Sequence, residues 1–175
     1  MIIWITGLSG AGKSTLASEL VLRLRNMGKS TVLLDGDELR MLFVPSAPKD
    51  LSHGREMRLA LALQYAELCR MLAKQELTVV IATISMFKEI QKWNRVNLPG
   101  YFEVFLKVPI DELRRRDPKE IYRRFDAGEL TDVAGLDLFV DEPVEADWIE
   151  EFTTGRNVSV MADELMYQLF GSRTI

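Results

Sequence analysis

Nine residues near the amino terminus, GLSGAGKST at positions 7–15, constrain the fold of this chain more than any other stretch. They contain the spacing Gly-x4-Gly-Lys-Ser of a phosphate-binding P-loop, directly after an apolar run at residues 2–6 and before a segment of helical period. In such a loop the glycines let backbone N–H groups turn toward phosphate oxygens, and the following helix N-terminus adds a partial positive charge. A chance glycine turn would lack this order of strand, loop and helix, so the motif predicts a site for a nucleoside triphosphate.

Two side chains of this loop are expected to carry chemistry. Lys13 should reach the β and γ phosphates of ATP, and the hydroxyl of Ser14 should bind Mg²⁺. We therefore predict ATP and Mg²⁺ as cofactors. The residues predicted to bind ATP are Gly7, Leu8, Ser9, Gly10, Ala11, Gly12, Lys13, Ser14, Thr15 and, from a later segment, Arg116.

Apolar β-rich runs alternate with segments of helical period along the whole chain, which is typical of a parallel sheet covered by helices on both faces. Strands are expected at Ile2–Thr6, Thr31–Asp35, Leu77–Thr83, Tyr101–Val108 and Asp147–Phe152. Helices are expected at Lys13–Met27, Gly54–Gln75, Met86–Asn97 and Val158–Phe170. No linker divides the sequence. It therefore predicts one domain over residues 1–175, with the three-layer α/β P-loop NTPase fold and a five-stranded parallel sheet.

Composition excludes several other classes of protein. The 175 residues include 22 Lys or Arg and 26 Asp or Glu, a formal net charge of −4, which argues against the broad basic surface that binds a nucleic acid polymer. One cysteine and one histidine rule out a disulfide scaffold and typical zinc sites. No apolar run approaches the roughly 18 residues of a spanning helix. We therefore expect no membrane partner and a reducing, cytoplasmic location.

A second motif, LLDGDELR at residues 33–40, follows the second predicted strand. Open α/β sheets bind ligands at the carboxyl ends of their strands, so Asp35 and Asp37 are candidates for phosphoryl-transfer chemistry. Asp37 is the candidate base for a substrate hydroxyl, and Asp35 would orient Mg²⁺ through water. For Asp35 a helix N-cap is an equally good interpretation. Arg40 would pair with an anionic substrate or be a solvated helix residue.

Arginines mark two further regions. Arg55 and Arg58 share a face near the start of a predicted helix, where cations are unfavourable unless an anion is nearby, so they predict a bound phosphate or sulfate; a solvated surface is the alternative. The stretch 111–145 is dense in Arg and Asp and too polar to form core, and we predict a mobile, Arg-rich lid that closes over the transferring phosphates. Lys119 and Arg116, which flank an Asp-Pro pair, are its candidate functional cations.

Taken together, these residues resemble the adenylylsulfate kinases, P-loop enzymes that use MgATP to phosphorylate the ribose 3′-hydroxyl of adenosine 5′-phosphosulfate. The matching stretches are GLSGAGKST (7–15), LDGDELR (34–40), ISMFK (84–88) and RRDPKEIYRRFDAGEL (115–130). The resemblance implies Asp37, Lys13 and Lys119 as catalytic residues, with Ser14 and Asp35 near the metal. Among the residues predicted to bind the acceptor nucleotide, the resemblance supports Arg40 and Arg55 as binders of its anionic group; the full predicted set is Asp35, Asp37, Arg40, Arg55, Arg58, Ile84, Ser85 and Lys88.

The chain departs from the family pattern where the acceptor base binds. The family sandwiches adenine between two phenylalanines; here Asp50 or Leu51 stands at the first position and Val133 at the second. Base stacking on an aromatic ring is worth about 1–3 kcal/mol per base, so the loss should weaken adenine binding. In addition, Arg58 replaces a family asparagine and Glu120 replaces a glycine of the lid.

Two acceptors therefore compete. WNRxNLPxYFEV (93–104) and VAGLDL (133–138) are similar to a divergent branch of the family, found with bacterial capsule biosynthesis, that phosphorylates cytidine diphosphoramidate. The missing aromatic pair favours this acceptor slightly, and the size of the family favours adenylylsulfate. The resemblance also leaves a homodimer open. From a different class, a non-catalytic nucleotide-binding regulatory module is the rival, although the chain lacks a guanine-reading Asn/Thr-Lys-x-Asp motif.

Overall fold

The computed structural model describes residues 1–43 and 54–171 of the chain. Its strands are β1 (Ile2–Thr6), β2 (Thr31–Asp35), β3 (Thr78–Ala82), β4 (Tyr101–Lys107) and β5 (Trp148–Glu151). Its helices are α1 (Lys13–Asn26), α2 (Gly36–Phe43), α3 (Arg55–Ala73), α4 (Lys88–Asn97), α5 (Ile110–Arg116), α6 (Ile121–Asp126) and α7 (Val158–Phe170). Among the residues described, no helix has the length and apolar composition needed to cross a membrane.

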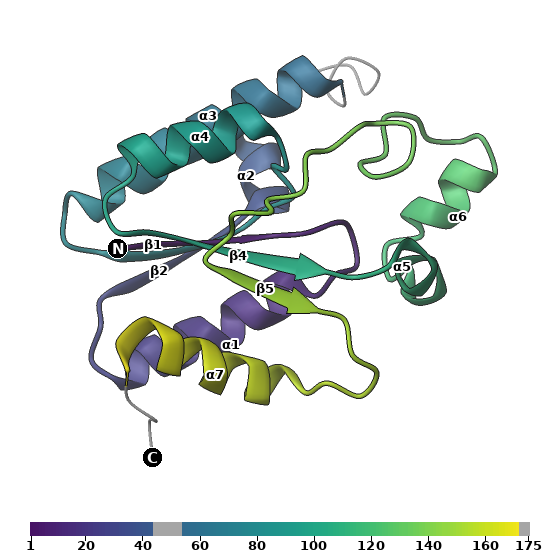
Figure 1. Ribbon diagram of the computed structural model, residues 1–175. Helices are drawn as coiled ribbons and strands as arrows, with labels where there is room; N and C mark the ends of the chain where they lie inside the picture. Colours follow the sequence, from purple (N-terminus) through teal and green to yellow (C-terminus); the bar gives the residue numbers. More distant parts are fainter. Residues whose placement is uncertain (44–53, 172–175) are drawn as a thin grey trace.

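The strands form one parallel sheet in the order β2-β3-β1-β4-β5 (Figure 1). At its centre, Ile5 of β1 is in register with Ala82 of β3 and with Val104 of β4. Because the strands all run in one direction, their carboxyl ends meet at one edge, and the strand order reverses beside β1, where open α/β sheets bind ligands. The predicted α/β fold with a five-stranded parallel sheet is confirmed.

Alternate residues of the central strand face opposite layers of helices. Ile3 and Ile5 pack in a cluster with α1 and α7, whereas Ile2 and Trp4 pack with α3 and α4. Figure 1 shows α1 and α7 on one face of the sheet and α3 and α4 on the other. These four side chains are at most 1% exposed, and full burial of one such side chain contributes about 1.5–3 kcal/mol. The sheet is thus held from both faces, which gives its carboxyl edge a fixed geometry.

The predicted elements are confirmed with small changes at their ends. Helix α7 has the predicted bounds, and α1 begins at Lys13 as expected. Helix α4 begins at Lys88 and not at Met86, because Phe87 is extended (φ −128°, ψ 134°) and buried. The ranges expected for helices did not include α2, α5 and α6, which are too short for a helical period to stand out, although a helix after Asp35 was one interpretation of the acidic motif.

The expectation that residues 111–145 are too polar for the core is wrong, because five of their apolar side chains are buried. Leu113 of α5 and Tyr122 of α6 are 0% and 1% exposed and belong to the same hydrophobic cluster as α1. A helix of two turns needs only one such anchor to dock, and its other residues can stay charged. The predicted lid is therefore seated beside the carboxyl end of β4, next to the P-loop (Figure 1).

Candidate active site

The loop after β1 has the shape that its glycines allow. Gly7 has φ +149°, and a Cβ there would lie 2.7 Å from the carbonyl oxygen of Leu106, so no other residue fits without a shift of the backbone. Gly12 precedes α1 with φ +96°, a left-handed conformation that L side chains rarely adopt. The loop therefore turns at the end of the central strand and directs the N-terminus of α1 toward the carboxyl edge of the sheet.

Lys13 is the first residue of α1, and its side chain folds back over the loop. Its Nζ donates a hydrogen bond to the carbonyl oxygen of Leu8 (2.9 Å). Burial, together with repulsion from Lys119, lowers the pKa of Lys13 to about 8, although Asp37 and Asp35 oppose the shift. A bound phosphate would favour the charged form. The position is therefore suited to an anionic ligand.

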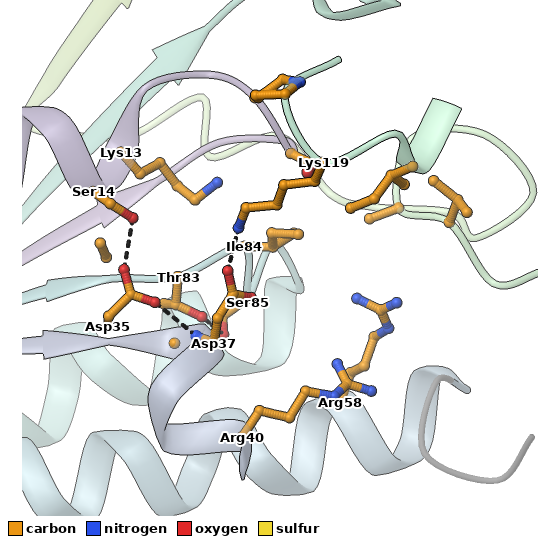
Figure 2. A pocket seen from close by; sticks show the side chains of 18 of the residues that line it. Lys13, Ser14, Asp35, Asp37, Arg40, Arg58, Thr83, Ile84, Ser85 and Lys119 are labelled. Carbon is orange, nitrogen blue, oxygen red and sulfur yellow. Dashed lines mark hydrogen bonds and ion pairs between the residues drawn. The ribbon is translucent and has the colours of Figure 1, made fainter. Parts of the chain in front are cut away.

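The two acids of the LLDGDELR motif lie opposite this loop (Figure 2). Asp35, the last residue of β2, accepts a hydrogen bond from Ser14 Oγ (2.6 Å) with one carboxylate oxygen and from the backbone N–H of Asp37 (2.8 Å) with the other. Asp35 thus both stabilises the first turn of α2 and contacts the P-loop serine. Gly36 between the acids has no room for a side chain, because a Cβ would lie 3.0 Å from Ala82 O and from Thr83.

The lid contacts both the P-loop and the acids. Lys119 forms an ion pair with Asp37 (Figure 2), and the hydroxyl of Tyr122 donates to the carbonyl oxygen of Ser9 (2.9 Å). Arg116 is paired with Glu112 and lies over the ring of Phe152, 4.9 Å from its centroid. The Lys119–Asp37 pair is exposed, and exposed pairs contribute only about 0–1 kcal/mol, so either partner can exchange the other for a substrate group at little cost.

These elements surround a cavity of about 730 Å³. The predicted site residues that line it are Ser9, Gly10, Gly12, Lys13, Ser14, Thr15, Asp35, Asp37, Arg40, Arg58, Ile84, Ser85, Arg116 and Lys119. Gly7, Leu8 and Ala11 are not in this lining, and their contact with ATP stays a prediction. A volume of this size is within the range of small-molecule sites.

The end of the cavity away from the P-loop is built by α2, α3 and the loop after α6. Arg40 and Arg58 lie there (Figure 2), with Leu61 and Tyr65 on the same face of α3 as Arg58. Burial and the nearby charge of Arg40 lower the pKa of Arg58 to about 10. Arg58 Nη2 donates to the carbonyl oxygen of Asp132 (2.8 Å), which connects α3 to the loop that carries Val133.

Two predicted acceptor-binding residues do not line this cavity. Arg55 donates to both carboxylate oxygens of Glu89 (2.8 and 2.9 Å) and lies 5.1 Å from the centroid of the Phe87 ring. Lys88 is exposed at the start of α4, where its backbone N–H donates to Asp141 (3.1 Å). Their contact with an acceptor stays a prediction. Asp50 and Leu51, at the first missing phenylalanine, lie outside the described residues.

The sequence interpretation missed several residues of the lining, including Tyr65, Phe87 and Asp132. Tyr65 could have been found, since Arg58, Leu61 and Tyr65 are spaced three and four residues apart and so share one face of a helix. Asp132 left no such signal. It lies in an irregular loop with φ +57° and reaches the cavity only through the tertiary structure.

Hard oxygen ligands for a magnesium ion lie together at the P-loop. Mg²⁺ is typically held in phosphoryl-transfer sites by one or two protein oxygens plus substrate phosphates and water. The contact between Ser14 Oγ and Asp35 fits this pattern. Within the described part of the chain, no group of three or more His, Cys, Asp or Glu side chains could hold a metal ion.

A P-loop after the central strand, an acidic pair after the neighbouring strand and a cationic lid define a P-loop kinase, a class of ATP-dependent phosphotransferase. The model of the adenylylsulphate kinase family matches residues 1–150. The chain therefore belongs to the adenylylsulphate kinase family, and its reaction is ATP-dependent phosphoryl transfer to a nucleotide.

Individual relatives agree with this assignment and differ in their acceptors. A "cytidine diphosphoramidate kinase" of Campylobacter jejuni is 34% identical over 168 residues, covering 96% of this chain and 95% of that protein. An "adenylyl-sulfate kinase" of Pseudomonas aeruginosa is 38% identical over 146 residues, covering 82% and 72%. A Mycobacterium tuberculosis APS kinase solved with AMPPNP and APS superposes with a TM-score of 0.86 at 30% identity and covers 96% of each chain.

Proposed function

We propose that this chain transfers the γ-phosphoryl group of ATP to the ribose 3′-hydroxyl of cytidine 5′-diphosphoramidate. The observation that carries the proposal is the acceptor end of the cavity. There Val133 stands where the family has a base-stacking phenylalanine, and Arg58 stands where it has an asparagine. The Campylobacter jejuni relative, which spans nearly the whole of both chains, supports the same acceptor.

In this proposal the phosphoryl group passes from ATP to the acceptor in the space that separates the P-loop from Asp37. The acceptor 3′-oxygen forms a bond to the γ-phosphorus, the bond to the β–γ bridging oxygen breaks with its electron pair leaving on ADP, and Asp37 takes the hydroxyl proton. Lys13 and Lys119 hold the charge on the transferred group, after Lys119 exchanges Asp37 for a phosphate oxygen. Ser14, and Asp35 through water, would hold Mg²⁺, which neutralises phosphate charge when it is bound.

Adenylylsulfate is the second candidate acceptor. It is favoured by the 38% identity to the Pseudomonas aeruginosa adenylyl-sulfate kinase. Arg40 in the cavity suits the 5′ group of either acceptor, because both groups are compact and anionic. The two acceptors differ mainly in their base, so the base end of the cavity decides between them.

A parallel kinase assay tests the proposal. The protein is incubated with MgATP and either acceptor, and ADP release and the 3′-phosphorylated product are measured. We expect a higher kcat/KM for cytidine diphosphoramidate, and turnover that is lost with EDTA and restored by added Mg²⁺. A strong preference for adenylylsulfate would contradict the proposed acceptor. Turnover of neither would favour a non-catalytic nucleotide-binding module.

We also propose that residues 1–175 act as one kinase domain, because P-loop, acids and lid all belong to one sheet and its connections. A homodimer and a cytoplasmic location stay predictions. Light scattering of the purified protein would test the first, and cell fractionation the second.

A further inference from the structure

Arg58 is placed at the acceptor end of the cavity in a way that its position in the sequence does not reveal. It leaves α3 on the face of Leu61 and Tyr65, on the side of the cavity away from Lys13 and Ser14 (Figure 2). Its guanidinium donates one hydrogen bond to the carbonyl oxygen of Asp132 (2.8 Å). A guanidinium carries its N–H donors in a planar fork, so this contact helps to fix the direction in which the fork points.

The loop beside Arg58 is held in one conformation. The carboxylate of Asp137 accepts from the backbone N–H groups of Asp132 (2.8 Å) and Val133 (2.6 Å). Asp132 has φ +57°, and the next two residues, Val133 and Ala134, are 7% and 5% exposed. Arg58, Asp132, Val133 and Ala134 all line the cavity. A cation and a carboxylate therefore stand together beside an apolar wall.

Charges of both signs act on the Arg58 guanidinium, because Arg40, Asp132 and Asp137 all lie near it. Asp132 and Asp137 both act electrostatically on its guanidinium, and both would repel a diphosphoramidate or phosphosulfate group. Arg40, which also lines the cavity, is the better candidate for that anion. A neutral group with donors and acceptors on one edge is compatible with both signs of charge.

Cytosine has such an edge. Its N4 amino group is a donor that a carboxylate can accept from. Its N3 and O2 are two adjacent acceptors that match the two N–H groups of a guanidinium fork. Adenine offers an amino donor and only one adjacent acceptor, N1, so the fork could make one hydrogen bond in place of two. The apolar wall of Val133 and Ala134 provides a surface for the base but no aromatic ring for stacking.

Building on the proposed function, we propose that Arg58 and Asp132 form a base-reading pair that selects an amino-pyrimidine acceptor over an adenine one. Arg58 is then a specificity-determining residue, with its fork on the two ring acceptors and the Asp132 carboxylate on the amino group. Selectivity comes from hydrogen bonds to the base edge in place of aromatic stacking.

The test compares the wild type with Arg58→Asn, Arg58→Lys and Asp132→Asn. The measured quantity is the ratio of kcat/KM for cytidine diphosphoramidate to kcat/KM for adenylylsulfate. A bidentate base contact is worth about tenfold or more in discrimination, so we expect Arg58→Asn to lower the ratio by at least about tenfold, through the KM of the cytidine substrate. The KM for ATP should stay within about twofold, since the P-loop is not altered.

Two of the variants separate base reading from other roles. Arg58→Lys keeps the positive charge but lacks the planar fork. If Arg58 reads the base, the ratio of the two kcat/KM values should stay low in this variant. A ratio equal to that of the wild type would indicate anion binding and overturn the proposal. Asp132→Asn keeps the backbone carbonyl that Arg58 contacts, so it should fold normally and still lower the ratio. Arg70→Asn, on the same helix but paired with Glu67, is the matched control and should leave the ratio unchanged.

A binding measurement keeps this inference separate from the proposed function. Calorimetric titration with cytidine 5′-monophosphate and adenosine 5′-monophosphate should show a preference of the wild type for the cytidine nucleotide that Arg58→Asn removes. If the wild type phosphorylates neither acceptor yet shows this preference, the proposed reaction fails and the base-reading pair stands. If it phosphorylates cytidine diphosphoramidate and the Arg58 and Asp132 variants keep its ratio, the pair is overturned and the reaction stands.

Discussion

The two ends of the cavity are built on different principles. The phosphate end comes from one contiguous stretch, residues 7–15, whose ligand groups are largely backbone N–H groups that any side chain at the variable positions would leave in place. The other end, where we propose that the acceptor binds, is assembled from α2, α3 and the loop after α6 and is lined by the side chains of Arg40, Arg58 and Asp132. Phosphate binding is therefore resistant to sequence change, whereas a few substitutions at the acceptor end can change the substrate.

The largest expected effect is on the phosphate end. Lys13→Met removes the cation that lies over the P-loop, and the loss of a preorganised charge at a transferring phosphoryl group costs about 10³-fold in kcat. Turnover with saturating MgATP and acceptor measures this. The kcat of the variant should fall by the same factor with both acceptors. A loss of kcat with only one acceptor would contradict the separate roles of the two ends of the cavity.

Asp37 lies between the two ends of the cavity. Its substitution should lower kcat and leave the KM for ATP nearly unchanged. Asp37→Asn removes the proposed proton acceptor, and general base catalysis is worth about 10²-fold or more, with the KM for ATP little changed. Steady-state kinetics with both substrates measures the split. Glu38→Gln is the matched control, because Glu38 is the exposed neighbouring acid and lies outside the cavity lining. Full activity of Asp37→Asn would rule out the base assignment.

The third prediction concerns stability against pH. The folded pKa of Lys13, about 8, lies below its ordinary value of 10.5, so between these pH values the unfolded chain binds the proton and the folded chain does not. The stability of the wild type relative to Lys13→Met therefore rises with pH through this window. Without nucleotide at pH 7, Lys13→Met should be the more stable by up to about 3 kcal/mol, and the gap should narrow above pH 8.

Thermal denaturation of both proteins from pH 7 to pH 10, without nucleotide, measures this difference. Added MgATP should reverse the order at pH 7, because only the wild type gains a lysine–phosphate interaction. A gap that does not change with pH would show that Lys13 is not held at a lowered pKa.

The smallest expected effect is on the contact between the lid and the P-loop. Tyr122→Phe removes the hydrogen bond from the Tyr122 hydroxyl to Ser9 O, and a single buried hydrogen bond contributes about 1 kcal/mol to the free energy of unfolding. Urea denaturation measures it. The same substitution at Tyr167, which is 55% exposed, is the control and should change stability by much less. An equal effect at both positions would argue against this contact.

The fold and the phosphate end were predictable because their signals are local. Strand β1, the loop and α1 follow one another directly, so the motif specifies all three. The strands alternate with helices, and this order leads to the observed parallel sheet. The acidic pair was also found from its place after a strand, although the sequence left open whether Asp35 capped a helix or faced the site, and in the structure it does both.

The acceptor end was predictable only in part. Arg55 and Arg58 looked equivalent in the sequence, three residues apart on one helix. The packing of Leu61 and Tyr65 sets the rotation of α3, so that Arg58 reaches the cavity while Arg55 turns to Glu89 and Phe87. Residues 111–145 looked too polar to pack, yet Leu113 and Tyr122 anchor α5 and α6 in the hydrophobic cluster beside the P-loop.

By itself, the sequence determined the class of fold, the phosphate loop and the acids after β2, since each depends on residues that are neighbours along the chain. The tertiary structure alone decided which of the two arginines of α3 lines the cavity, that Asp132 contacts it, and that Lys119 meets Asp37. These contacts join residues 74 and 82 positions apart, and such pairs meet only after the helices have packed on the sheet. Periodicity and motif spacing describe the near neighbours of a residue, whereas the rotation of a helix and the path of a loop follow from the packing of the whole core.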